Sequence, residues 1–163
     1  MAPPLPPQVP PAVPDKDPAH WLYRLTPAEW LSAAEHELVL CAEALQRRAV
    51  RPGVTHARRA AGMAWNAVLA GEPAPTDGSA SAPDLRYGRS YMEHLKALAE
   101  DAPDTAGALP GVPDEVRAAA RALCEAPTVP PALITIGKPD LRTLEAARAV
   151  IAHARARAGV SSE

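Results

Sequence analysis

The 163 residues carry a formal net charge of −2, and 47% of them are apolar although the chain contains no Phe. This length is sufficient for one domain. An alanine-rich core buries modest area per residue, so an apolar face can stay exposed on the monomer, and a homodimer that covers this face is expected. The near-neutral charge excludes a general nucleic-acid coat protein, which is usually strongly basic, but it permits a local basic patch.

The two cysteines and the hydropathy of the chain bear on its compartment. Cys41 and Cys124 lie in helical patterns without metal-ligand spacing, so we expect buried, reduced thiols, no bound metal and no cofactor. No stretch approaches the roughly 18 apolar residues that a membrane span needs, and the N-terminus lacks a signal-peptide core. We therefore predict a cytoplasmic protein without a membrane partner.

Proline dominates residues 1–19. Because proline fixes φ and lacks an amide donor, this stretch cannot join a helix or a sheet ladder, and we predict a disordered tail. A single helical domain is expected over residues 20–159, followed by a flexible tail over 160–163.

Two helices are predicted at the start of this domain. Thr26-Pro-Ala-Glu29 has the pattern of a capping box and precedes apolar residues at helical spacing, which indicates a helix from about Pro27 to Arg48. Arg51-Pro52-Gly53 is expected to break it. A second apolar stripe follows at once, so the two helices form an antiparallel hairpin. Gly62 lies beside this stripe, where glycine costs about 1 kcal/mol relative to alanine, so we expect a close helix crossing there.

Three further helices are predicted after a Pro/Gly/Ser-rich loop over residues 72–84. The first opens with a capping box at Ser90, the next begins at Pro113, and the last runs from near Pro139 to Gly159. The β-branched run over residues 132–136 has no strand to pair with and is interpreted as an extended, buried connector. The fold class is therefore all-α, an up-and-down bundle of about five helices.

The second helix also resembles a known family. Residues 56–69, HARRAAGMAWNAVL, are similar to the segment HAQQAAEKALKALL that many HEPN (higher eukaryote and prokaryote nucleotide-binding) domains carry, with His56 and the alanines in register. His94-Leu95 resembles the GHDL-type segment of that family, and Lys138-Pro139-Asp140 lies where many members have RYPD. The resemblance covers about Trp30 to Arg157. It departs from the family pattern at Arg58-Arg59, at Gly62-Met63 and at Asn66.

The resemblance implies either an RNA-cutting toxin or a non-catalytic module that binds a nucleotide or a partner protein. The partner it implies is a nucleotidyltransferase or an antitoxin. HEPN ribonucleases carry an arginine and, about four to six residues further on, a histidine, which would stabilise phosphate charge and transfer a proton.

Three pairs fit this spacing: Arg51/His56, Arg89/His94 and Arg148/His153. The last pair is separated by about 140° around one helix, and His56 already belongs to the opening of the second helix. Arg89 precedes the Ser90 cap and could fold back toward His94. These two residues are the predicted catalytic pair if the chain is a metal-independent ribonuclease.

Cationic residues also gather around the tip of the predicted hairpin, where the N-terminus of the second helix favours an anion. The predicted ligand-binding residues are Arg47, Arg51, His56, Arg58 and Arg59. Arg48 belongs to the same cationic tip but is not among them. They would hold the phosphate of a nucleotide or of RNA, or else form a solvated end with local ion pairs. Three functions stay open: a HEPN-like binding module, a ribonuclease, and a structural dimeric interaction protein.

Overall fold

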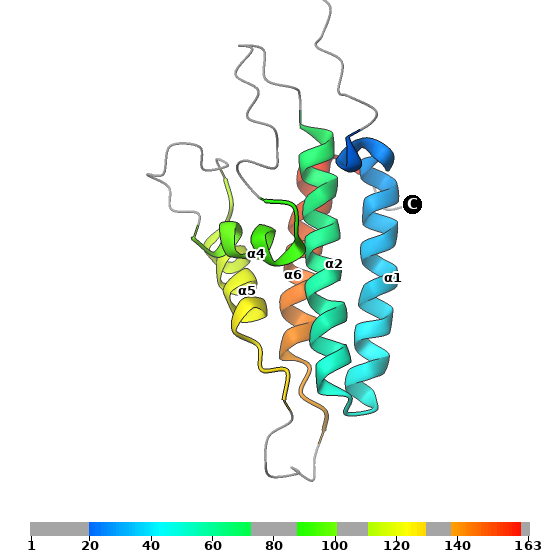
Figure 1. Ribbon diagram of the computed structural model, residues 1–163. Helices are drawn as coiled ribbons and strands as arrows, with labels where there is room; N and C mark the ends of the chain where they lie inside the picture. The colour runs from blue at the N-terminus through cyan, green and yellow to red at the C-terminus, as the bar shows by residue number, and fades with distance from the viewer. Residues whose placement is uncertain (1–19, 73–87, 101–110, 130–137, 161–163) are drawn as a thin grey trace, which may run out of the picture.

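The computed structural model describes residues 20–72, 88–100, 111–129 and 138–160, and over these residues the protein is all-helical, which confirms the predicted fold class. The helices are η1 (Trp21–Arg24), α1 (Pro27–Gln46), α2 (Val50–Gly71), α4 (Tyr91–Glu100), α5 (Asp114–Glu125) and α6 (Arg142–Ala158). Figure 1 shows α1, α2 and α6 side by side as the long helices, with the shorter α4 and α5 against one flank.

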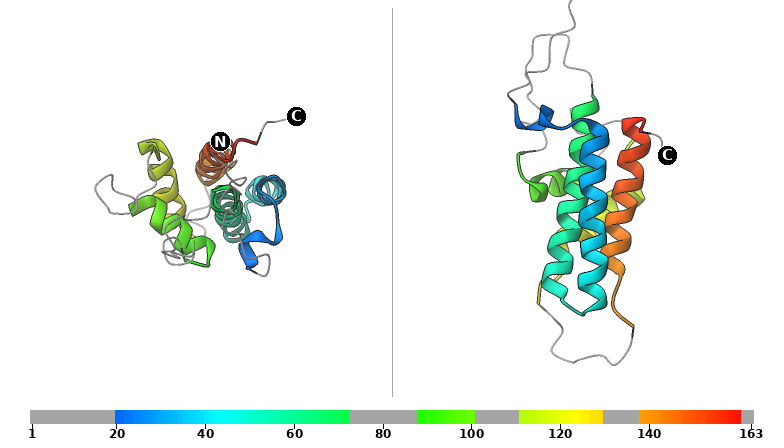
Figure 2. Two further views of the ribbon diagram at one scale, coloured as in Figure 1. Left: turned by 90° about the horizontal axis from the view of Figure 1, so that it is seen from above. Right: turned by 90° about the vertical axis from the view of Figure 1, so that its right-hand side faces the viewer.

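Helix α2 is the centre of the molecule. It contacts α1, α6, α4, α5 and η1, and the view from above in Figure 2 shows α1, α2 and α6 as one group with α4 and α5 beside it. Most of the residues of α2 after Gly53 are buried, whereas its neighbours each bury one face. Most side chains on α2 after Gly53 therefore lie against a second helix.

The beginning of α1 is secured as predicted. Thr26 Oγ1 accepts from the Glu29 backbone N–H and the Glu29 carboxylate accepts from the Thr26 N–H, which completes the capping box. The short helix η1 is tied to α1 because the Trp30 indole N–H donates to the Leu22 carbonyl at 2.9 Å. These contacts position the aromatic side chains of η1 over the end of the bundle.

The turn between α1 and α2 lies three residues earlier than expected, so the prediction that Arg51-Pro52-Gly53 breaks the helix is wrong. The turn has the hydrogen bonds of a Schellman motif, from the Ala49 N–H to Ala44 O and from the Arg48 N–H to Leu45 O. Arg48 occupies the left-handed position with φ 58°. Pro52 is tolerated in the first turn of α2 because the amides there have no intrahelical acceptor.

Helix α2 packs closely against its neighbours because many of its buried residues are alanine or glycine. The close crossing expected at Gly62 is confirmed, since Tyr91 of α4 lies directly on this glycine. A Cβ at position 62 would overlap the Tyr91 side chain, with Tyr91 Cγ only 2.6 Å away. Glycine is therefore required here by the approach of α4 and not by its backbone conformation.

Two further helix ends agree with the sequence, whereas the last helix begins at Arg142, three residues after the predicted start near Pro139. The Glu93 carboxylate accepts from the Ser90 N–H at 2.8 Å and Ser90 Oγ accepts from the Glu93 N–H, which confirms the second capping box. Helix α6 ends at Gly159, which adopts the left-handed conformation with φ 66°. The predicted tail over 1–19, the predicted tail over 160–163 apart from Val160, most of the 72–84 loop and the 132–136 connector lie outside the described residues.

Histidine 153 on α6 stacks on Trp65 of α2 with ring centroids 6.3 Å apart and planes 12° apart. Its Nε2 atom is buried and has no hydrogen-bond partner. Burial lowers the pKa of His153, the nearby Arg157 lowers it further, and Glu115 opposes the shift. Folding therefore favours the neutral form of the His153 imidazole over the protonated form.

This preference predicts a loss of stability in mild acid. The unfolded chain binds a proton at His153 near the ordinary histidine pKa, whereas the folded protein binds it only at lower pH, so folding becomes less favourable as the pH falls through this range. The urea midpoint of the wild type is expected to fall between about pH 7 and pH 5 by more than that of His153→Gln. Equal pH dependence of the two proteins would contradict the prediction.

Candidate functional site

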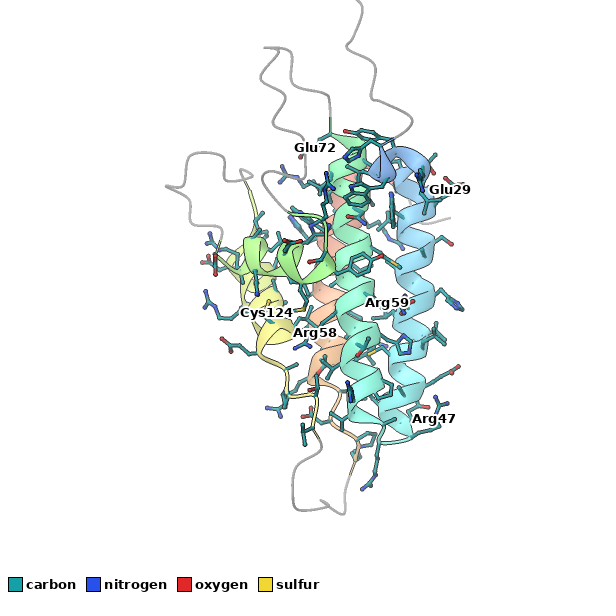
Figure 3. All side chains as sticks on the ribbon, in the orientation of Figure 1. Glu29, Arg47, Arg58, Arg59, Glu72 and Cys124 are labelled. Atoms are coloured by element: carbon teal, nitrogen blue, oxygen red, sulfur yellow. The ribbon has the colours of Figure 1, made fainter. Side chains whose placement is uncertain are left out.

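The five predicted ligand-binding residues do not form one patch at the hairpin tip; the structure distributes them over three places. Arg47 and Arg51 lie at the tip, Arg58 contacts α5, and His56 and Arg59 face α1. Figure 3 shows Arg47 at the end of the hairpin, Arg58 beside Cys124 of α5, and Arg59 on the α1 side of α2. Each place has its own electrostatic environment.

The tip itself is an exposed basic end. The Arg47 guanidinium lies 3.8 Å from the Glu43 carboxylate, and both side chains are mostly in solvent, so this ion pair is weak. Arg51 is exposed in the first turn of α2. The Ala49 N-cap supplies no side-chain acceptor to the free amides of that turn, so the positive end of the helix dipole is uncapped.

Arg58 has a different partner from the one that the sequence suggested. Its Nε donates to Leu123 O at 2.8 Å, and its Nη2 donates to Cys124 O at 3.0 Å and to Ala126 O at 3.1 Å. These carbonyls belong to the last turn and the C-cap of α5, which have no intrahelical donors. Arg58 therefore joins α5 to α2, and its donors are directed at backbone and not at a ligand.

The Glu37 carboxylate, between α1 and α2, contacts the remaining two predicted ligand-binding residues, His56 and Arg59. Glu37 Oε2 accepts from His56 Nδ1 at 2.6 Å, and Glu37 Oε1 lies 3.5 Å from Arg59 Nη1. The exposed fractions of the side chains are 11% for Glu37, 24% for His56 and 47% for Arg59. The acid is thus enclosed beneath an imidazole and a guanidinium that both reach solvent.

Tyr91 of α4 completes this arrangement, which we call the Glu37 cluster (Glu37, His56, Arg59 and Tyr91). Burial raises the pKa of the Tyr91 phenol, Arg59 lowers it and Glu37 raises it, so the ring is close to both charges. His56, Arg59 and Gly62 recur every three residues and share one face of α2. Because Tyr91 lies on Gly62, the imidazole, the guanidinium and the tyrosine are arranged along this face.

The Glu37 cluster has defined chemical capabilities. The carboxylate fixes the imidazole orientation through Nδ1, which leaves Nε2 as the nitrogen that can donate to or accept from a ligand. The guanidinium offers further N–H donors beside it, in the planar geometry that suits phosphate oxygens. Side chains of this kind in this arrangement can bind an anion and can hold or transfer one proton.

The predicted catalytic pair has contrasting surroundings. His94 is completely buried, its Nε2–H donates to Asn66 Oδ1 at 2.8 Å, and the Trp21 ring stacks on it. Arg89 is exposed, and its backbone N–H donates to the Glu93 carboxylate. A substrate would reach this imidazole only after the helices around it open. Catalysis by Arg89 and His94 stays a prediction.

Glu37 and Tyr91 were not singled out by sequence reasoning as members of a site. The signal for Glu37 was present, because it occupies the apolar stripe of α1 between Ala34 and Cys41, where a carboxylate is costly unless it is paired. Tyr91 could not be placed from sequence, since its position depends on the docking of α4 against Gly62.

Neither the described side chains nor the comparisons add a further assignment. Within residues 20–72, 88–100, 111–129 and 138–160, no three His, Cys, Asp or Glu side chains group as metal ligands. No helix in the described part of the chain has both the length and the hydropathy that a membrane crossing requires. No protein-family model, curated protein or solved structure matches this chain.

Proposed function

We propose that this protein is a HEPN-like helical module that binds a phosphate-bearing ligand, a nucleotide or an RNA strand, at the Glu37 cluster. The observation that carries the proposal is the row of His56 and Arg59 on α2, an imidazole and a guanidinium that reach solvent and are held in place by one enclosed carboxylate. A preorganised arginine and imidazole bind phosphate with little ordering cost. The resemblance of residues 56–69 to the HEPN helix also supports this choice.

The exposed arginines at the hairpin tip add a second, weaker contribution. Arg47 and Arg51 lie close to the uncapped first turn of α2, so their field attracts a polyanion without fixing its position. A strand of RNA is therefore expected to gain affinity from the tip, whereas a mononucleotide gains little.

The test is the affinity for fluorescent oligouridylate and for nucleotides at low salt. Arg59→Met keeps the aliphatic stem but removes the charge, and we expect it to weaken binding about tenfold or more. The matched control is Arg142→Met on α6, whose guanidinium is 90% exposed and pairs with the neighbouring Asp140, and it should change affinity less than about twofold.

Two outcomes would reject the proposal: no binding to any nucleotide or oligonucleotide, or equal affinity of wild type and Arg59→Met. The double substitution Arg47→Met/Arg51→Met tests the tip separately. A larger loss from this pair than from Arg59→Met would move the binding site to the tip and away from the Glu37 cluster.

A further inference from the structure

The Glu37 cluster contains its own anion. Glu37 accepts from His56 at 2.6 Å and faces the Arg59 guanidinium at 3.5 Å, so one carboxylate interacts with both of the side chains that a ligand would need. Water reaches little of this carboxylate, and its charge is therefore felt strongly by its neighbours. An incoming phosphate has to compete with Glu37 for Arg59.

The outcome of that competition depends on the charge of His56. With a neutral imidazole, the positive charge of Arg59 and the negative charge of Glu37 cancel. When the imidazole is protonated, the cluster carries one positive charge in excess. The short hydrogen bond to Glu37 is then made by a charged donor, so the carboxylate has a cationic partner other than Arg59. Histidine is the side chain whose charge ordinarily changes between about pH 5 and pH 8.

We propose that Glu37 makes anion binding at this site proton-linked: it holds Arg59 while His56 is neutral and releases it to the ligand when His56 is protonated. Glu37 is then a positioning residue, because it acts on the ligand through Arg59 and His56. This inference rests on the proposed function and names the regulation of the same site.

The other groups around the cluster do not titrate in the same range. The Tyr91 phenol, contributed by α4, keeps its proton because burial raises its pKa. The contacts of α2 with α5 and α6 lie elsewhere, since Arg58 and Trp65 are about 160–180° around the helix from His56. The ionisable groups that set the charge of the site are therefore Glu37, His56 and Arg59.

The direction of the effect follows from these charges. Affinity for a ligand of constant charge is expected to rise as the pH falls, because His56 gains its proton and the cluster gains a net positive charge. Oligouridylate is a suitable probe, since its phosphodiesters stay ionised and its bases stay neutral throughout. The wild type should bind it roughly tenfold more tightly at about pH 5.5 than at about pH 8.

Two substitutions separate regulation from structural support. Glu37→Gln keeps a side-chain oxygen for His56 but removes the competing charge, so at pH 8 it should bind as tightly as the wild type does at pH 5.5. His56→Asn keeps an N–H donor that never becomes charged, so its affinity should stay low and equal at both pH values. Circular dichroism at each pH checks that the variants are folded.

Each result decides one of the two proposals. If binding depends on Arg59 but the wild type has the same affinity at both pH values, the proton linkage is rejected and the proposed function stands. The same conclusion follows if folded Glu37→Gln binds no better than wild type at pH 8, or if His56→Asn keeps the full pH effect. If Glu37→Gln does not fold, His56→Asn alone decides. Loss of all oligouridylate binding in the wild type rejects the proposed function itself.

Discussion

Replacing Arg58 by methionine is expected to loosen α5 from the bundle and to lower the free energy of unfolding by about 2–4 kcal/mol. The substitution removes three hydrogen bonds to carbonyls at the end of α5, and these carbonyls have no other intrahelical donor. It also removes the cation that faces the negative end of the helix dipole. Urea unfolding followed by circular dichroism measures the change.

The two cysteines report where the loosening occurs. Cys124 lies half-buried on α5, whereas Cys41 is fully buried in α1 and burial raises its pKa to about 11. In native buffer, Cys124 should react with a thiol reagent at least about tenfold faster in Arg58→Met than in the wild type, while Cys41 stays protected. Loss of the Arg58 charge alone would slow the reaction, because that charge lowers the pKa of Cys124.

Arg142→Met on α6 is the control. Arg142 pairs with Asp140 and both side chains are mostly exposed, so its loss should cost no more than about 0.5–1 kcal/mol. If Arg58→Met and Arg142→Met were equally stable and equally protected at Cys124, Arg58 would not be what joins α5 to α2.

Replacing Gly62 by alanine is expected to destabilise the protein by about 1–3 kcal/mol, although alanine is the better helix former by about 1 kcal/mol. The added methyl group overlaps both the Cβ and the ring of Tyr91, so α4 itself must move. Since Tyr91 belongs to the Glu37 cluster, the same substitution should also weaken oligouridylate binding. Thermal unfolding and the binding assay measure the two effects.

A control glycine and a double substitution identify the cause. Gly71 lies in the last turn of α2, where a Cβ would meet Pro27 Cγ at an ordinary 3.6 Å, so Gly71→Ala should leave stability unchanged or raise it. Because the Tyr91 Cβ is one of the overlapping atoms, only Tyr91→Gly gives the methyl group room, and in that background Gly62→Ala should no longer destabilise. A loss of stability from Gly62→Ala that persists in the Tyr91→Gly background would contradict the steric explanation.

Local signals in the sequence were enough to predict most of the fold. The capping boxes at Thr26 and Ser90, the apolar periodicity and Gly159 act within a few residues, and the structure has helices where they indicate them. The α1–α2 turn was misplaced because Pro52 was interpreted as a breaker. A proline in the first turn of a helix loses no hydrogen bond, and the turn depends instead on Arg48 adopting a left-handed conformation.

The candidate site was predictable only in part, because sequence names charged residues but not their partners. Arg58 and Arg59 are adjacent, yet one bonds to carbonyls more than sixty residues away on α5 and the other faces Glu37 on α1. The helical rotation of about 100° per residue separates them, and only the packed helices determine what each one meets. Glu37 could have been recognised from the sequence pattern, since its carboxylate interrupts the apolar stripe of α1.

The smooth buried face of α2 has a consequence for how this protein tolerates mutation. Its buried alanines are Ala57, Ala60, Ala61, Ala64, Ala67 and Ala70. Alanine scanning, the usual way to map a core, cannot test these positions because they are already alanine. A scan that adds methyl groups is the informative one, since helices this close leave no space for them. Substitutions of these alanines by larger residues should therefore lower the stability of the protein strongly.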